Sequence, residues 1–433
     1  MKKILPIIML IIIFILSFCV INTQAELYNG LFDLSFLVED IVIYKKLPDN
    51  TIKQSISVLH KLIQKDPYNI ELYIALANNY NKMNRYEDAL TLLKEASFID
   101  ANYSSLYLAI GETHDLMGNK DDAIYAFEKM VEVDYLNYKN HFTLGMAYLR
   151  RHNFSHAQDE FNKTIEINPF SASAYYYLGL IALQDNNFEQ ALVLFSNAVK
   201  LQPAMYQALN NIGVIYQKHK QDNESSKYFT KSIEFNPNYD IGNFNLGRLL
   251  LKRGNYQEAK EKLEISLSQN KEREKTYYLL GLICEQLNQI MESVEYFKYL
   301  SEHYPENISY TSILAQLYTR MKDYKSAEQC YVSLLGNNKV NAYILVNYGI
   351  VLEKLKMNDE ASVMYKDAIR QRPTYTRAHM LLAKYYLRKF QFSNTFKELL
   401  KSGNYLYSSI MIIILVSIFV IVVCLSLKIF FHH

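Results

Sequence analysis

Cysteine and histidine are the residues of this chain best suited to binding a metal or acting as nucleophiles. The four cysteines are Cys19, Cys284, Cys330 and Cys424, with no CxxC spacing and no pair of histidines near them. A zinc site or a disulfide framework needs such spacing, so we predict neither. We expect the cysteines to be buried, inert thiols.

The histidines are scattered singly along the chain, apart from a terminal pair. They are His60, His114, His141, His152, His156, His219, His303 and His379. None of them recurs with a carboxylate or a cysteine at a consistent spacing, as catalytic and metal-binding histidines would. We therefore expect helix-surface or packing roles for these histidines and predict no metal site.

Motifs that cradle phosphates or carry hydrolytic chemistry are missing from the sequence. It contains no GxxxxGKS/T, GxGxxG, HExxH or GxSxG. We therefore predict that the chain is not an enzyme and binds no cofactor. The 46 basic and 44 acidic residues leave a formal charge of +2, which argues against a nucleic-acid groove and its strongly basic surface.

Small residues recur every 34 positions through the middle of the chain. One series runs Ala89, Ala123, Ala157, Ala191, Ser225, Ala259, Ser293, Ala327, Ala361 and Thr395. Twelve residues upstream, a second series runs Ala77, Gly111, Gly145, Gly179, Gly213, Gly247, Gly281, Ala315, Gly349 and Ala383. Six of the eight prolines share one phase of this period, so chance does not explain it. Such a period predicts a stack of equivalent structural units.

The residue types within one period suit a hairpin of two antiparallel helices. Helices approach closely only where side chains are small, so we expect Gly179 to meet Ala191, with the ring of Phe195 filling the space beside them. A polar turn separates the helices, and its expected N-cap residues are Asn119, Asn153, Asn187, Asn255 and Asp323. Proline, as at Pro203, ends the second helix because it cannot continue one.

This pattern resembles the tetratricopeptide repeat family. The family's order is an aromatic residue, Leu-Gly, Tyr, Ala, an aromatic four residues later and a closing Pro, and it is met closely in residues 138–171, 172–205 and 206–239. The resemblance implies an all-α, right-handed superhelical solenoid of ten 34-residue helix-turn-helix repeats. The repeats start near residues 70, 104, 138, 172, 206, 240, 274, 308, 342 and 376.

The concave face of such a solenoid is lined mainly by the first helix of each repeat. Projection of the repeat predicts partner-binding apolar residues there, namely Leu108, Phe142, Met146, Tyr176, Leu180, Phe244, Tyr278 and Leu282. Later repeats also place basic residues on this face: Arg248, Lys252, Arg320, Lys354, Lys384 and Arg388. The alternative is that the apolar residues pack within or between helices and that the basic residues are only solvated.

Two kinds of family member suggest more specific binding. Members that clamp a terminal carboxylate use Lys and Asn, but here Ile74 and Ala109 stand at two of those places, so a clamp is not expected. Long sugar-transferase members hold peptide backbone with a column of asparagines. This chain has a partial column, Asn211, Asn245 and Asn347, which implies that peptide-backbone binding is possible.

Both ends of the chain are strongly apolar. Residues 4–21 follow two lysines and carry no charge, so 1–25 is expected to be a cleaved signal peptide or an uncleaved signal anchor. Residues 409–427 are also uncharged and long enough to cross a bilayer, and they predict a transmembrane helix followed by a short tail, 428–433. A degenerate half-repeat within 26–69 caps the solenoid of 70–390, and 391–408 forms a C-terminal cap and juxtamembrane segment.

The charge distribution then predicts the topology and, with the repeats, a function. Lys2 and Lys3 keep the N-terminus in the cytoplasm, which places the repeat domain outside the cytoplasm, in the periplasm or on the outer face if the source is bacterial. We expect a membrane-anchored scaffold that binds protein or peptide partners. The alternative is a regulatory or assembly subunit of an envelope enzyme, such as a glycan or lipopolysaccharide synthesis complex.

Overall fold

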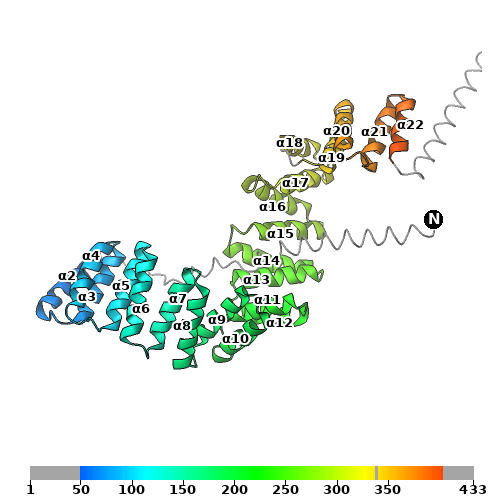
Figure 1. Ribbon diagram of the computed structural model, residues 1–433. Helices are drawn as coiled ribbons and strands as arrows, with labels where there is room; N and C mark the ends of the chain where they lie inside the picture. The colour runs from blue at the N-terminus through cyan, green and yellow to red at the C-terminus, as the bar shows by residue number, and fades with distance from the viewer. Residues whose placement is uncertain (1–48, 337–339, 403–433) are drawn as a thin grey trace, which may run out of the picture. The chain divides into compact units, whose positions relative to one another are not determined.

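The computed structural model describes residues 49–336 and 340–402, and every regular element within these ranges is a helix. Helix α2 (Asp49–Lys65) precedes ten helix pairs (Figure 1). The first helices are α3 (Ile70–Lys82), α5 (Ser104–Met117), α7 (Tyr138–Arg150), α9 (Ala172–Gln184), α11 (Tyr206–Lys218), α13 (Asp240–Lys252), α15 (Glu274–Gln286), α17 (Ile308–Arg320), α19 (Ala342–Lys354) and α21 (Thr376–Arg388). The second helices are α4 (Tyr86–Ser97), α6 (Lys120–Val133), α8 (Phe154–Ile167), α10 (Phe188–Leu201), α12 (Asp222–Phe235), α14 (Tyr256–Gln269), α16 (Ile290–His303), α18 (Tyr324–Leu334), α20 (Asn358–Gln371) and α22 (Phe392–Lys401).

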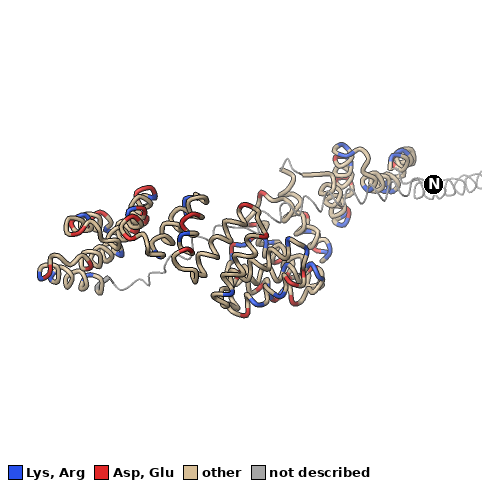
Figure 2. Tube along the Cα trace, turned by 60° about the horizontal axis from the view of Figure 1, so that its bottom comes forward, with Lys and Arg blue, Asp and Glu red and all other residues tan. Residues whose placement is uncertain are grey.

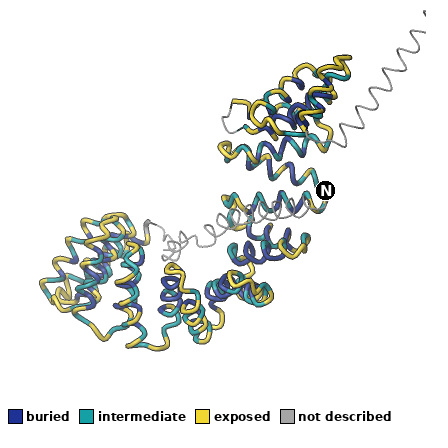
Figure 3. Tube along the Cα trace, turned by 45° about the vertical axis from the view of Figure 1, so that its right-hand side comes forward, coloured by how far each residue is buried: buried dark blue, intermediate teal, exposed yellow. Residues whose placement is uncertain are grey.

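These helices form two compact units, an N-terminal unit that ends at Pro237 and a C-terminal unit that begins at Asn238. Within each unit a helix packs mainly on the helices before and after it in the chain. Buried residues lie on the sides where neighbouring helices meet, and most turns are exposed (Figure 3). The predicted all-α hairpin architecture is therefore confirmed, and its right-handed superhelical course stays a prediction.

A close contact between the helices of each pair explains the column of small residues. A Cβ atom added to Gly179 would lie 2.7 Å from Cε1 of Phe195, and the atoms nearest to it all belong to that ring. Gly145 meets Phe161 in the same way. The ring of Phe195 thus fills the space beside the small residues, as expected, and at the equivalent Gly247 the backbone oxygen of Ala259 lies 3.1 Å from an added Cβ.

The turn between paired helices has the same backbone conformation in all ten repeats. Its central residue has a positive φ in each: Asn84, Gly118, His152, Asn186, Lys220, Gly254, Asn288, Lys322, Lys356 and Phe390. The next residue is the N-cap of the second helix, as predicted. The side chains of Asn153, Asn187 and Asp323 accept a backbone N–H there, whereas Asn119 and Asn255 cap without such a bond.

The predicted membrane segments lie outside the described residues. Residues 1–25 and 409–427 belong to the parts of the chain of which nothing is described, as do Cys19 and Cys424. Within residues 49–336 and 340–402, no helix combines the length and the apolar character needed to cross a bilayer. Of the predicted N-terminal cap, the structure describes α2, whose Ile56, Leu59 and Ile63 pack against the core formed by α3 and α4.

Candidate functional site

In the N-terminal unit, the predicted partner-binding residues lie among the packing contacts between repeats. Leu108, Phe142 and Met146 are half-buried, while Tyr176 and Leu180 are only 7% and 6% exposed. The ring of Phe142 lies 5.6 Å from that of Phe161 and 5.8 Å from that of Tyr177. These side chains therefore stabilise the stack, and a second role in binding stays a prediction.

The C-terminal unit places its predicted residues in a similar way. Tyr278 and Leu282 are half-buried, and Tyr278 packs edge-on against the ring of Phe297, with 6.0 Å between ring centroids. Phe244 is buried, and the guanidinium of Arg273 lies 5.0 Å from its ring centroid. The apolar stripe predicted from the sequence is thus partly covered, by the paired helix at Tyr278 and by the next repeat at Phe244.

The asparagines of the partial column differ in their hydrogen bonding. Asn211 in α11 and Asn347 in α19 occupy the same position of their repeats, four repeats apart, and both are half-buried. Their Nδ2 atoms are buried and have no hydrogen-bond partner among the described residues. Asn245, one repeat after Asn211, is 2% exposed. A buried donor without an acceptor is costly, and peptide binding by Asn211 and Asn347 stays a prediction.

Ion pairs between neighbouring repeats neutralise several of the predicted basic residues. An acidic residue near the end of one first helix pairs with an arginine of the next first helix, 35 residues later. The pairs are Asp115 with Arg150, Glu285 with Arg320 and Glu353 with Arg388, and Lys384 also contacts Glu353. Arg320, Lys384 and Arg388 are thus each paired with a carboxylate. Acidic and basic residues lie interspersed over the described helices (Figure 2).

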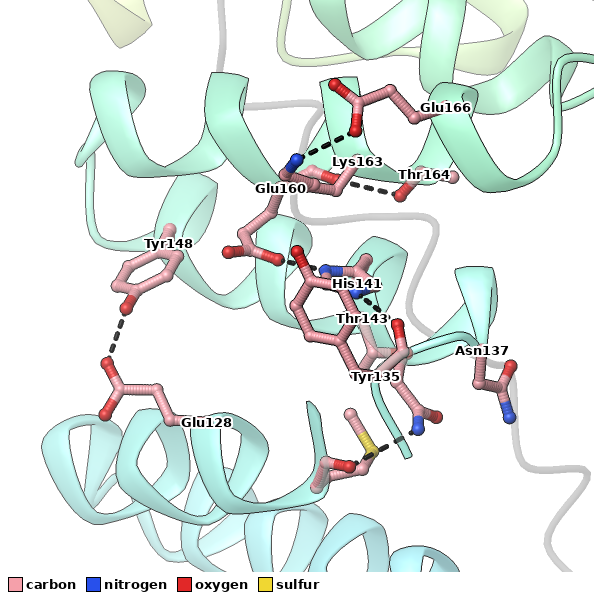
Figure 4. A network of polar contacts seen from close by, with 12 residues as sticks. Glu128, Tyr135, Asn137, His141, Thr143, Tyr148, Glu160, Lys163, Thr164 and Glu166 are labelled. Atoms are coloured by element: carbon pink, nitrogen blue, oxygen red, sulfur yellow. Dashed lines mark hydrogen bonds and ion pairs between the residues drawn. The ribbon is translucent and has the colours of Figure 1, made fainter. Parts of the chain in front are cut away.

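Two histidines are hydrogen-bonded to carboxylates that the sequence analysis missed. Nδ1 of His141 lies 2.7 Å from Oε2 of Glu160, and Nε2 lies 2.8 Å from the carbonyl oxygen of Tyr135 (Figure 4). His379 makes the equivalent contacts with Glu398 and with the carbonyl oxygen of Pro373. Our prediction that the histidines lack consistent carboxylate partners was therefore wrong at these two positions. The signal was a glutamate 19 residues after the histidine, present in only two repeats.

The two described cysteines are free thiols, and burial was predicted correctly for Cys284 only. Cys284 is fully buried and Cys330 is half-buried, and burial raises the pKa of each thiol to about 11. Beside Cys284, the buried ammonium of Lys260 bonds to Glu292 of the following repeat and to Gln289, 3.1 Å away. This cluster therefore joins α14 to α16 and offers no reactive thiolate near neutral pH.

Comparison with protein families agrees with the hairpin geometry. Models of the tetratricopeptide repeat match residues 49–110, 142–203, 206–239, 228–261 and 274–298. The chain belongs to the tetratricopeptide repeat family. Proteins with this repeat bind protein or peptide partners, and the fold is typically a scaffold without enzymatic activity of its own.

Individual relatives are distant. The Protein O-mannosyl-transferase Tmtc3 of Drosophila melanogaster is 25% identical over 131 residues, which cover 30% of this chain and 14% of that protein. Among solved structures, Pseudomonas aeruginosa PilF is 19% identical, with a TM-score of 0.45 over 49% of this chain and 97% of its own. YrrB, described as a tetratricopeptide repeat protein with an unusual peptide-binding site, is 21% identical, with a TM-score of 0.36 over 42% of this chain and 95% of its own.

Proposed function

We propose that this tetratricopeptide repeat chain is a membrane-anchored scaffold that holds extended segments of partner proteins against its first helices. The observation that carries the peptide-binding part is the unpaired Nδ2 donor at Asn211 and again at Asn347. A half turn of each amide exchanges Nδ2 with Oδ1, so either atom can face a ligand. A peptide in extended conformation offers backbone carbonyl and N–H groups at regular spacing, which is the chemistry these amides need.

Membrane attachment is the second part of the proposal, and the sequence of the two ends supports it. The uncharged runs in 4–21 and 410–427 bracket the repeats, and the lysines before the first run favour export of everything between them. Protease added to sealed spheroplasts or membrane vesicles tests the orientation. Residues 70–390 should be cut from the extracytoplasmic side, and protection from that side would contradict the proposed topology.

Site-specific photo-crosslinking in the full chain tests peptide binding. Tyr343, which is 46% exposed near the start of α19, and Tyr125, which is 63% exposed on second helix α6, are each replaced by p-benzoylphenylalanine. We expect crosslinks to polypeptide from position 343 and not from position 125. Adding Asn347→Leu should reduce the yield from position 343 by roughly tenfold, since it removes a buried hydrogen bond to the ligand. Equal yields from both sites, or no effect of Asn347→Leu, would contradict the proposal.

A regulatory subunit of an envelope glycan-assembly enzyme is a second candidate. The partial match to a protein named as an O-mannosyl-transferase favours it over other enzyme partners. Deletion of the gene should then change a glycan or glycolipid product while other protein complexes stay intact. Loss of a protein complex with unchanged glycans would support the general scaffold instead.

A further inference from the structure

An exposed apolar stripe follows one side of α22, the last described helix. Phe392, Phe396 and Leu400 lie at intervals of four residues and are 48%, 43% and 55% exposed. The neighbouring side of the same helix packs on α21 through Thr395 and Leu399, which are both buried. The helix therefore has two apolar sides, and the repeat itself covers only one of them.

At the position of Phe396, earlier repeats do not leave the second helix open. Where the next helix lies in the same compact unit, it packs over the second helix. The residues equivalent to Phe396 in those repeats are all buried or half-buried: Leu90, Ile124, Gln158, Leu192, Lys260, Val294, Glu328 and Ser362. The end of a repeat stack normally has a polar outer face, since nothing covers it. Phe392 and Phe396 depart from that rule.

The turn before α22 departs from the other repeats as well. The residue with positive φ in this turn is Phe390, at φ 58° and 79% exposed. In all nine remaining repeats the equivalent residue is Gly, Asn, Lys or His. A bulky side chain in the left-handed conformation is strained, and such strain persists where the side chain serves another contact. The ring of Phe390 lies edge-on to that of Phe392, with 6.4 Å between ring centroids, so it extends the exposed apolar stripe.

The surroundings of the stripe indicate what covers it. Lys397 and Lys401 come next around the helix after the stripe, and Lys397 makes no ion pair with a described residue. Only residues 402–409 separate Lys401 from the uncharged run of 410–427. Eight residues span at most about 28 Å. If that run crosses a bilayer, α22 lies near its surface.

We propose that α22 rests on a bilayer containing anionic phospholipids, with Phe390, Phe392, Phe396 and Leu400 among the acyl chains and Lys397 at the headgroups. This inference rests on the membrane anchoring proposed above. An apolar stripe beside lysines is the pattern of helices that lie in the membrane interface. The contact holds the last repeat against the membrane and so limits how far this repeat can move relative to the bilayer.

The absence of tryptophan from the chain allows a direct test. The full chain is reconstituted into vesicles that contain anionic lipids and lipids brominated in the upper acyl chain, with Phe396→Trp supplying the only indole. Two matched variants serve as controls: Asn394→Trp, on the polar side of the same helix, and Met291→Trp, a residue 64% exposed on α16. We expect bromine to quench the fluorescence of the Phe396→Trp variant at least about twofold and to leave the other two nearly unchanged.

The other outcomes separate this inference from the anchor it rests on. A Phe396→Trp chain that resists extraction with alkaline carbonate but shows no quenching would overturn the inference and leave the anchor standing. Blue-shifted emission from this variant without quenching would also overturn it, because another part of the chain or a second copy then covers the stripe. A chain released by carbonate, but quenched before the wash, would keep the lipid contact and contradict the anchor.

Discussion

The imidazole of His141 and the carboxylate of Glu160 form a partly buried contact of 2.7 Å, and an equivalent pair recurs seven repeats later. His141 is 1% exposed, and its other ring nitrogen faces a backbone carbonyl. Since a carbonyl oxygen only accepts, Nε2 must donate, and the proton between Nδ1 and Glu160 completes the pair. The contact links α7 to α8, where the α15–α16 pair has the edge-on rings of Tyr277 and Tyr296 at the same two positions.

The first prediction concerns this pair. Glu160→Leu should lower the free energy of unfolding by about 1–3 kcal/mol, because it leaves a buried ring nitrogen without its partner. Adding His141→Tyr should restore most of the stability, since the following repeat has Tyr175 and Leu194 at these two positions. Denaturant unfolding of the wild type, the two single variants and the double variant measures this coupling as a double-mutant cycle. A Glu160→Leu variant as stable as wild type would show that the pair contributes nothing.

The second prediction concerns the close approach of paired helices. Gly179→Ala should destabilise the protein by about 1–3 kcal/mol, because the new Cβ overlaps the ring of Phe195. The double variant Gly179→Ala, Phe195→Leu should recover part of this loss, since the first repeat already pairs Ala77 with Leu93. Thermal unfolding of the wild type and the two variants tests it. An unchanged midpoint for Gly179→Ala alone would contradict the packing argument.

The third prediction concerns the ion pairs between neighbouring first helices. Glu353→Gln removes the carboxylate shared by Lys384 and Arg388 and should cost about 1 kcal/mol at low salt. The difference from wild type should shrink in roughly 1 M salt, because the two basic groups are half exposed and salt screens them. Glu360→Gln, at an exposed residue on α20, is the matched control and should have almost no effect. A loss that does not depend on salt would point to lost packing instead of charge.

The fourth prediction follows from the raised pKa values of Cys284 and Cys330, both about 11 because of burial. At pH 8 the thiolate fraction should be about a hundredfold below that of an ordinary cysteine. Alkylation of the native protein should therefore be slow at pH 8 and accelerate roughly tenfold per pH unit towards pH 11. Peptide mapping by mass spectrometry follows each cysteine, with the urea-unfolded chain as the control. Equal rates in native and unfolded protein at pH 8 would contradict this.

The sequence alone determined the hairpins, because every repeat makes the same local and nearest-neighbour contacts. Gly179, Phe195 and the N-cap Asn187 lie within one period and act within one helix pair, so their spacing is visible as a pattern. Where the same packing requirement recurs at a fixed interval, the residues that meet it share one position in the aligned repeats and can be recognised in the sequence. For the same reason the polar turn and the closing proline could be placed before the structure was known.

Contacts between repeats were decided only by the tertiary structure. The burial of Tyr176 and Phe244, and the pairing of Glu353 with Arg388, depend on the small rotation from one helix pair to the next. That rotation sets which side of each first helix contacts the next repeat. No residue type at any one position of the sequence indicates the size of the rotation. The pairing of His141 with Glu160 lies within one helix pair, but it recurs in only one other repeat and therefore leaves no column in the sequence. The outer side of α22 is exposed because no described helix follows it.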